Sequence, residues 1–286
     1  MTERSADGLV VVVTGAGPGS IGLATARALR DRGAEVVVST RSELPAGYDG
    51  HRLDLADPDS VERFVGWLED RYAGGIDVLV NNAGIHLDLR SRWREPQLVD
   101  GHEVHWRTNY LGTAHLTRRL LPALLRTAEE VGEARVVNVV SQLHLRGRNA
   151  WLDGQVTPYD SWDAYGTSKL ALVHEATEIE RRFGARGLHG YSLHPGSVYT
   201  KVADRGLETA PVLARLRKVL APLERRALAT PEEGARTTVF CATSSEAVPG
   251  GYHRRSAPSE PSPEVADERA GAVLWDRTTA WLDGLG

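Results

Sequence analysis

The chain contains one cysteine, one methionine and three phenylalanines among its 286 residues. A single thiol cannot form an internal disulfide, and it cannot build the zinc or iron-sulfur sites that need several thiolates. This scarcity of cysteine fits a reducing compartment. We therefore interpret Cys241 as a small residue of the hydrophobic core.

Long apolar stretches are also missing. No run of residues approaches the length of about 18 apolar positions that a membrane-spanning helix needs. The amino-terminal residues Met1–Gly8 are polar and charged. We expect a soluble, cytoplasmic protein without a membrane partner.

An excess of positive charge is absent as well. The formal net charge is -4 at pH 7 and the isoelectric point is about 6.2, which argues against a nucleic acid as the main partner. The ten histidines form no H-E-x-x-H or similar ligand pattern. We therefore predict no metal site.

The chain does contain an alternation of short apolar, β-branched runs with amphipathic helical patterns. Continuous apolar runs are typical of strands buried on both faces, and their alternation with helices favours a parallel sheet. With 41% hydrophobic residues and no obvious linker or repeat, we expect an α/β fold in a single domain, residues 1–286. This fold would be a Rossmann-type, doubly wound parallel sheet with helices on both faces. The predicted strands are Leu9–Val13, Val36–Thr40, Arg52–Leu55, Val78–Asn81, Arg135–Ser141 and Tyr191–His194, and the predicted helices are Ile21–Arg32, Ser60–Tyr72, Val104–Arg126 and Ala164–Phe183.

Two segments interrupt this alternation. Residues 142–162 are mixed in composition and rich in turn formers, so we predict a lid-like insertion over the carboxyl edge of the sheet. Residues 254–268 are rich in proline, serine and charge, and we predict a surface loop there. The apolar pattern resumes at Val273, which predicts a carboxyl-terminal helix that packs back onto the domain.

A glycine-rich stretch, residues 14–22, separates the first predicted strand from the first predicted helix. It contains a G-x-G-x-x-G pattern at Gly17, Gly19 and Gly22. Glycines let the backbone approach a pyrophosphate, and the helix amino terminus offers N–H groups to it. The position predicts a dinucleotide site, although a tight connection between strand and helix would also explain the glycines.

The tip of the second predicted strand bears on the choice of coenzyme. An acidic side chain there would bind the 2′-hydroxyl of NAD(H), whereas a cation would bind the 2′-phosphate of NADP(H). The chain has Arg41 at this tip and no carboxylate before Glu43. We therefore predict NADP(H) over NAD(H). The alternative is that Arg41 is a solvated loop cation.

Tyr165 and Lys169 stand four positions apart in a predicted helix, so the phenol and the ammonium share one face, one turn apart. A phenol is a poor acid or base at neutral pH, and a neighbouring cation favours its phenolate. The pair predicts a proton-transfer group in which Lys169 lowers the pKa of Tyr165. Such pairs also arise by chance on solvated helices, so the prediction depends on the other motifs.

Together, the motifs over residues 9–253 resemble the short-chain dehydrogenase/reductase family. The branch that holds retinol dehydrogenases and carbonyl reductases is the most similar, because of the sequence after Asn109, the long gap between Ser141 and Tyr165, and the sequence from His194 to Thr200. The shared elements, in family order, are Thr14-Gly15, Asp54-Leu55, Asn81-Asn82-Ala83-Gly84, Asn109, Ser141, Tyr165 with Lys169, and His194-Pro195-Gly196.

The resemblance implies a catalytic group of four residues. Tyr165 would exchange a proton with the substrate oxygen, and Ser141 would donate a hydrogen bond to the same oxygen. Lys169 would hold the nicotinamide ribose, and Asn109 would anchor a water that connects Lys169 with solvent. The cofactor contacts that the resemblance implies come from Gly15, Gly19, Ser20, Ile21, Gly22, Arg41, Asp54, Leu55, Asn81, Ala83, Gly84, Tyr165, Lys169, Pro195, Gly196, Val198 and Thr200.

The chain also departs from the family pattern. Ser20 is an extra residue in the glycine-rich turn, so either Gly19 or Ser20 would take the middle phosphate contact. Val140 stands where many relatives carry a serine, which leaves Ser141 as the hydroxyl at that strand end. Tyr165 follows Ser141 by 24 positions, more than is common in the family, so the intervening residues would loop outward.

These features predict hydride transfer between NAD(P)H and a carbonyl or alcohol group of a lipophilic or polyketide-like molecule. Candidate substrate contacts are His86, His144, Trp151 and Tyr159, although aromatic residues of the insertion would equally pin it to the domain. Two alternatives stay open: reduction of a carbon-carbon double bond, and a non-catalytic NADPH-sensing interaction protein. The substrate, the reaction direction and the oligomeric state are not encoded, and a homo-oligomer is compatible with the sequence.

Overall fold

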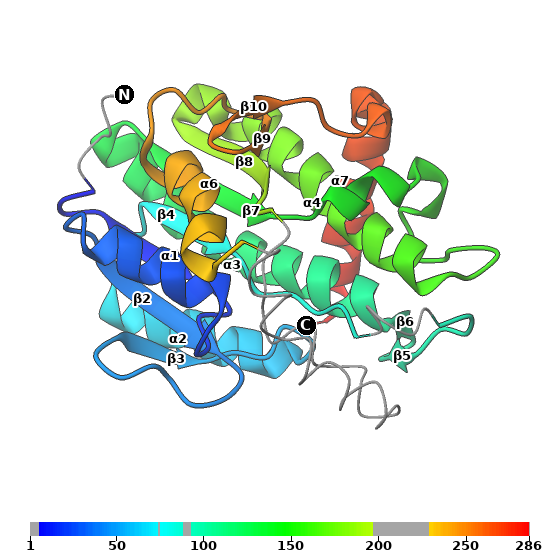
Figure 1. Cartoon of the computed structure of the whole chain (residues 1–286), viewed down its shortest axis with the longest axis horizontal. Helices are drawn as coiled ribbons and strands as arrows, with labels where there is room; N and C mark the ends of the chain where they lie inside the picture. The colour runs from blue at the N-terminus through cyan, green and yellow to red at the C-terminus, as the bar shows by residue number, and fades with distance from the viewer. Residues whose placement is uncertain (1–5, 74, 88–92, 197–228, 286) are drawn as a thin grey trace.

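A computed structural model describes residues 6–73, 75–87, 93–196 and 229–285 of the chain. Eight strands form one central sheet in the order β10-β9-β8-β7-β4-β1-β2-β3 (Figure 1). The strands of this sheet are β1 Val10–Val13, β2 Glu35–Thr40, β3 Asp49–Arg52, β4 Val78–Asn81, β7 Ala134–Val139, β8 Leu188–His194, β9 Tyr252–Arg254 and β10 Ala257–Ser259. A small hairpin, β5 Leu98–Val99 with β6 His102–Glu103, lies outside it.

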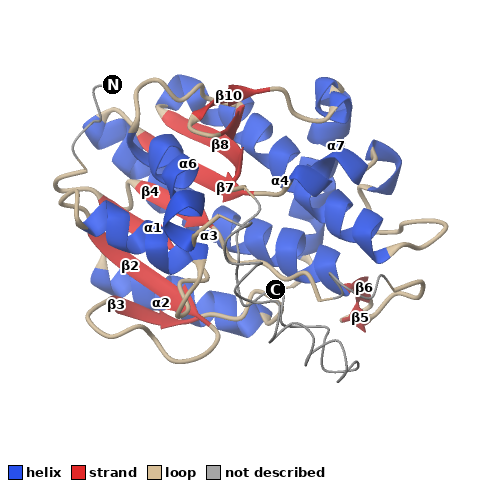
Figure 2. Ribbon diagram, viewed as in Figure 1, coloured by secondary structure: helices blue, strands red, loops and turns tan. Residues whose placement is uncertain are grey.

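Helices cover both faces of the sheet (Figure 2). The valines of β1 show the reason, because Val11 and Val13 pack with α1 and α6, whereas Val12 packs with α2 and α3 on the other face. The helices are α1 Ile21–Arg30, α2 Pro58–Arg71, α3 Gly112–Val131, α4 Ser161–Phe183, α6 Pro231–Thr243 and α7 Glu268–Asp283. The predicted α/β fold with a doubly wound sheet is therefore confirmed.

The strand order reverses between β1 and β4. From β1 the chain proceeds to β2 and β3 on one side, and from β4 it proceeds to β7 and β8 on the other. Connections that leave this point diverge to opposite sides, so a crevice opens at the carboxyl ends of the two strands. The glycine-rich turn after β1 and the turn after β4 meet there.

The third strand differs from its predicted bounds. The sequence predicts a strand over Arg52–Leu55, but the ladder with β2 runs over Asp49–Arg52. Leu53 and Leu55 are buried against α2 after the ladder has ended. Their apolar character therefore reflects packing onto the helix layer rather than pairing in the sheet.

The predicted surface loop over residues 254–268 is partly regular. Residues Ala257–Ser259 pair antiparallel with β9, so the edge of the otherwise parallel sheet is antiparallel. Arg255 and Ser256 both have positive φ (55° and 57°), the backbone of a tight two-residue hairpin turn. A one-turn 3-10 helix, η6 Pro263–Ala266, follows. Three-residue strands with a proline give no apolar alternation, so the sequence did not reveal this hairpin.

Two further regions refine the predictions. The helix expected from Val104 begins with a π-helical segment, η1 Trp106–Leu111, which continues into α3. The predicted lid-like insertion contains two 3-10 helices, η2 Gln142–Arg146 and η3 Asn149–Trp151, before α4 begins. Among the described residues, no helix combines the length and apolarity needed to span a membrane.

Candidate active site

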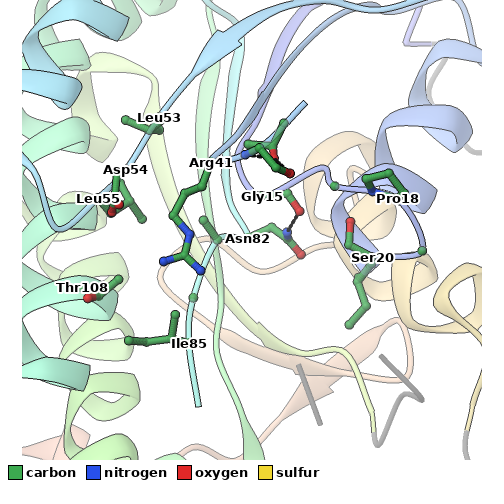
Figure 3. A pocket seen from close by; sticks show the side chains of 17 residues that line it. Gly15, Pro18, Ser20, Arg41, Leu53, Asp54, Leu55, Asn82, Ile85 and Thr108 are labelled. Carbon is green, nitrogen blue, oxygen red and sulfur yellow. Dashed lines mark hydrogen bonds between the residues drawn. The ribbon is translucent and has the colours of Figure 1, made fainter. Parts of the chain in front are cut away.

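A cavity of about 380 Å³ opens at the carboxyl ends of β1, β2 and β4 (Figure 3). Nine of the predicted cofactor residues line it: Gly15, Gly19, Ser20, Ile21, Arg41, Asp54, Leu55, Ala83 and Gly84. The sequence reasoning missed other lining residues, notably Pro18, Thr40, Ser42, Asn82, Ile85 and Thr108. Most of these are immediate neighbours of predicted residues, so the motifs located the cavity but not all of its wall.

The glycine-rich turn leaves its backbone open toward the cavity. Gly15 and Gly19 have positive φ (72° and 75°), a conformation that favours glycine. A Cβ on Gly15 would lie 2.8 Å from the Cα of Ala83, whereas a Cβ on Gly19 would meet no atom within 4 Å. Ser20 caps α1, because its hydroxyl accepts from the N–H of Leu23 at 3.0 Å. This open backbone at a helix amino terminus fits the pyrophosphate of a dinucleotide.

Gly22 plays a different part from the predicted one. It does not line the cavity, and a Cβ there would lie 2.5 Å from Nδ2 of Asn82 and 2.7 Å from the carbonyl oxygen of Gly15. The glycine therefore permits close packing between α1 and the two turns. Its effect on a bound dinucleotide would be indirect.

Asn82, rather than Asn81, faces the cavity. Its side chain donates to the carbonyl of Thr14 at 2.8 Å, and Thr14 Oγ1 accepts from the backbone N–H groups of Asn82 and Ala83, each at 3.0 Å. Asn81 points into the core and donates to Thr117 and Asn138, each at 2.9 Å. The two adjacent asparagines thus have separate structural tasks, which an Asn-Asn pair alone does not reveal.

Arg41 reaches from the end of β2 into the cavity (Figure 3). Its backbone carbonyl accepts two hydrogen bonds from Arg52, from Nε at 3.2 Å and from Nη2 at 3.0 Å. The N–H of Ser42 donates to the hydroxyl of Thr40 at 3.1 Å. The tip of β2 therefore presents a guanidinium and two hydroxyls beside the cavity.

The cavity wall at Asp54 and Leu55 depends on a buried arginine that the sequence reasoning missed. Arg107 is 1% exposed, and its Nη1 donates to the carbonyl of Leu55 at 3.1 Å. Asp54 accepts from the N–H of Ala56 at 2.9 Å, which fixes the turn after β3. Thr108, the next residue along the chain, completes this wall.

Tyr165 and Lys169 lie one turn apart on α4, as predicted, with the Lys169 Nζ atom 5.9 Å from the centre of the Tyr165 ring. Burial lowers the pKa of Lys169 to about 8, and Nζ donates to the carbonyl of Val139 at 3.2 Å. Burial raises the pKa of Tyr165 to about 12, and a hydrogen bond with the Ser141 side chain opposes this rise. The net shift of the Tyr165 pKa is therefore upward, opposite to the predicted lowering, because the effect of burial is the largest.

Gly84 connects the cavity with this group. A Cβ on Gly84 would lie 3.1 Å from Nζ of Lys169 and 3.3 Å from Oδ1 of Asn109. Asn109 lies in the π-helical segment, a feature that is frequent at functional sites. Its Oδ1 accepts from the N–H of Ile85 at 2.7 Å, and its Nδ2 donates to the Ile85 carbonyl at 3.0 Å. Asn109 thus holds the turn that separates the cavity from Lys169.

His86 stacks on Tyr165. The two ring centres are 4.0 Å apart and the planes differ by 7°. Trp162 and His105 contact the His86 ring edge-on, at 5.6 Å and 5.8 Å between centres. Of the four predicted substrate residues, His86 is therefore the one that the structure brings against the Tyr165 ring.

Other substrate candidates have structural contacts. His144 is 1% exposed and uses both ring nitrogens in hydrogen bonds to backbone groups. The Tyr159 hydroxyl donates to Glu103 at 3.1 Å, which pins the insertion to the β6 strand. Trp151, at the end of η3, is partly exposed. The pinning interpretation thus fits Tyr159.

The last predicted cofactor residues follow β8. Pro195 and Gly196 are described but do not line the cavity, and Gly196 has a positive φ of 93°. Val198 and Thr200 lie outside the described residues. Their predicted contacts with the nicotinamide end stay predictions.

The doubly wound sheet and the glycine-lined cavity at its switch point are typical of dinucleotide-binding proteins. A sequence model described as short chain dehydrogenase matches residues 9–210. Retinol dehydrogenase 12 of Bos taurus is 33% identical, over 96% of this chain and 86% of that protein. Polyprenol dehydrogenase of Mus musculus is 36% identical, over 94% of this chain and 82% of that protein.

Solved structures agree with this similarity. A crystal structure of an uncharacterised protein from Mycobacterium paratuberculosis superposes with a TM-score of 0.72 at 29% identity, covering 99% of this chain and 96% of that one. The aldohexose dehydrogenase of Thermoplasma acidophilum shares the fold, with a TM-score of 0.64 at 23% identity over 91% of this chain and 99% of that one. The chain belongs to the short-chain dehydrogenase/reductase family, near its retinol dehydrogenase branch. It is therefore an oxidoreductase of a family that uses a nicotinamide cofactor.

Proposed function

We propose that this enzyme is an NADP(H)-dependent oxidoreductase that interconverts a carbonyl and an alcohol group on a lipophilic small molecule. The observation that carries the proposal is the continuity of the site. The cavity wall at Gly84 adjoins Asn109 and Lys169, and Lys169 shares a helix face with Tyr165. A dinucleotide in the cavity would therefore end beside Tyr165, which contacts Ser141 and lies one helical turn from Lys169.

The residues of the site suit proton transfer to a carbonyl oxygen. When bound, the nicotinamide supplies or accepts the hydride. A Tyr165 phenol with a pKa of about 12 keeps its proton at neutral pH, so it can donate that proton to the substrate oxygen as negative charge develops. Ser141 would donate a hydrogen bond to the same oxygen. Lys169 is cationic below pH 8 and would stabilise the phenolate that remains.

The choice of coenzyme and substrate class rests on two further observations. The Arg41 guanidinium with the Thr40 and Ser42 hydroxyls at the tip of β2 suits a 2′-phosphate better than a 2′-hydroxyl. The relatives named retinol dehydrogenase and polyprenol dehydrogenase are named for apolar alcohols, which supports a lipophilic substrate.

The test is NADPH oxidation by the purified protein against aldehydes, ketones and quinones, with NADH in parallel. We expect turnover with NADPH, a weaker rate with NADH, and a loss of about 100-fold or more in Tyr165→Phe. Arg41→Ser should weaken NADPH binding and leave NADH binding nearly unchanged. Turnover that survives Tyr165→Phe would contradict the mechanism. Reduction of the carbon-carbon double bond of an unsaturated ketone, rather than of its carbonyl group, would favour the double-bond alternative.

A further inference from the structure

His144 lies one turn beyond β7 and is 1% exposed. Its Nδ1 atom is 2.7 Å from the backbone carbonyl oxygen of Ser141. Its Nε2 atom is 3.0 Å from the backbone nitrogen of Ser262, a residue 118 positions further along the chain. One buried imidazole thus joins the strand end that carries Ser141 to the segment between β10 and α7.

The two partners determine the protonation of the ring. A carbonyl oxygen can only accept a hydrogen bond, so Nδ1 carries the proton, and an N–H can only donate, so Nε2 offers its lone pair. A second proton would place a donor against the Ser262 N–H. Burial lowers the pKa of His144, which keeps the ring neutral at ordinary pH. The neighbouring groups do not disturb this: Tyr252 packs its ring at 4.7 Å, and burial lowers the pKa of His194 to about 4.

These bonds bear directly on Ser141. Its Oγ accepts from the N–H of Leu143 at 3.2 Å, and its hydroxyl also forms a hydrogen bond with the Tyr165 side chain. The flanking backbone is held on both sides, because Val140 N–H donates to Leu193 at 2.8 Å and Gln142 N–H donates to His194 at 3.2 Å. The carbonyl between them is held by His144. Without the imidazole, this carbonyl keeps only its bond with the backbone N–H of His144, at 3.1 Å.

The other end of the connection is also anchored. Glu264, two residues after Ser262, accepts from the N–H of Asn149 at 2.6 Å with its carboxylate and from Nδ2 of Asn149 at 2.8 Å with its carbonyl. The segment from β10 to α7, orange in Figure 1, passes beside α4 and contacts it through η6. It therefore holds the 142–151 region at two points.

We propose that His144 is a positioning residue that fixes the Ser141 hydroxyl by tying its backbone to Ser262. Part of the catalytic geometry is then set by a segment that lies outside the family motifs. This inference rests on the proposed function, because it assigns His144 no contact with the substrate and acts only through Ser141.

A double-mutant cycle tests the inference with the fastest carbonyl substrate of the panel and NADPH. We expect His144→Ala to lower kcat by about tenfold or more in the natural sequence and to have no further effect in a Ser141→Ala background. The dissociation constant for NADPH should change less than twofold, because His144 does not line the cavity. Equal losses in both backgrounds would mean a general structural effect and would overturn the inference.

Ser262 provides a matched pair of variants. Ser262 has a φ of -57°, which proline adopts, and Ser262→Pro replaces the N–H that binds His144 with a ring carbon, which breaks this hydrogen bond. Both Ser262→Pro and Ser262→Ala lose the hydroxyl that accepts from the N–H of Glu264, but only the proline variant loses the N–H of residue 262. We expect the loss of kcat in Ser262→Pro alone.

The variants also separate the two proposals. If Ser141→Ala leaves kcat unchanged, the proposed function fails. If Ser141→Ala lowers kcat while His144→Ala and Ser262→Pro do not, only this inference fails.

Discussion

Single residues decide whether the site holds its protons at neutral pH. The Tyr165 phenol and the Lys169 ammonium are both buried. Burial raises the pKa of Tyr165 and lowers the pKa of Lys169, and each shift favours the neutral form of the group. A neutral phenol is the form that can donate a proton, as the proposed reduction of a carbonyl group requires. The reverse reaction would need the phenolate, which Lys169 and Ser141 would have to stabilise.

The burial of Lys169 predicts a pH-dependent stability. Its pKa is about 8 in the folded state against 10.5 in the unfolded chain, so below pH 8 the charged group costs the folded state about 3 kcal/mol. The cost declines as pH rises from 8 to 10.5, because only the unfolded state then binds the proton. Relative to Lys169→Met, the natural protein should therefore gain stability over this range, measured by urea unfolding at pH 7 and pH 10.

The Tyr165 phenol provides the check on this prediction. Its raised pKa costs stability above pH 10, but both proteins carry that residue and the term cancels in the difference. A difference between the two proteins that is the same at pH 7 and pH 10 would contradict the assignment.

The stacked His86 predicts a second residue-scale effect. His86→Ala removes the ring that lies 4.0 Å from the Tyr165 ring, which admits water and frees the phenol to turn. We expect the pKa of Tyr165 to fall toward 10 and kcat to fall by roughly tenfold. His86→Phe keeps a ring at this place and should retain most activity. The phenolate absorbance of each variant, minus that of its Tyr165→Phe counterpart, reports the pKa; an unchanged pKa in His86→Ala would argue against a role for the stack.

At the scale of helices, two glycines with the same propensity should respond in opposite directions. Gly66 lies in α2 with no atom within 4 Å of an added Cβ, so Gly66→Ala should stabilise the protein by about 1 kcal/mol. Gly112 begins α3, where an added Cβ would overlap the carbonyl of Leu55, a residue of the cavity wall, so Gly112→Ala should destabilise the protein and weaken NADPH binding. Thermal unfolding with and without NADPH measures both; a stabilising Gly112→Ala would contradict the packing.

Elements differ in how well the sequence predicted them. The valine runs of β1, β2 and β4 are buried on both faces, so composition alone identified them. The hairpin of β9 and β10 was missed because its three-residue strands show no apolar alternation, and β9 joins the sheet through a long-range pairing with β8. Likewise, the motifs predicted nine residues of the cavity wall, whereas the tasks of Asn82, Gly22 and Arg107 depend on which side chains meet across separate turns.

At the scale of the whole molecule, the carboxyl-terminal helix completes the core. Tyr110 in the π-helical segment bonds to Thr278 in α7 at 2.7 Å between hydroxyl oxygens. The Arg118 guanidinium lies 3.0 Å from the centre of the Trp275 ring and donates to Glu175 at 3.3 Å. Segments from the middle and the end of the chain thus share one buried charged cluster.

For this cluster we predict a large loss of stability on one substitution and its partial recovery on a second. Arg118→Met leaves the fully buried carboxylate of Glu175 without its cation, which should cost about 3–5 kcal/mol. Adding Glu175→Gln removes the charge and should recover much of the loss. Denaturant unfolding of the three variants measures this, and additive losses in the double variant would show that the two residues do not act as a pair.

Cys241 lies in α6 with no exposed surface, and burial raises the pKa of its thiol. The chain has no other cysteine, so labelling by a thiol reagent reports on this residue alone. Because the thiol is buried, we expect the reagent to react only after α6 detaches from the sheet. The rate of labelling under native conditions therefore measures how often this helix opens. A change of this rate on addition of NADPH would show whether the coenzyme stabilises α6, which does not line the cavity.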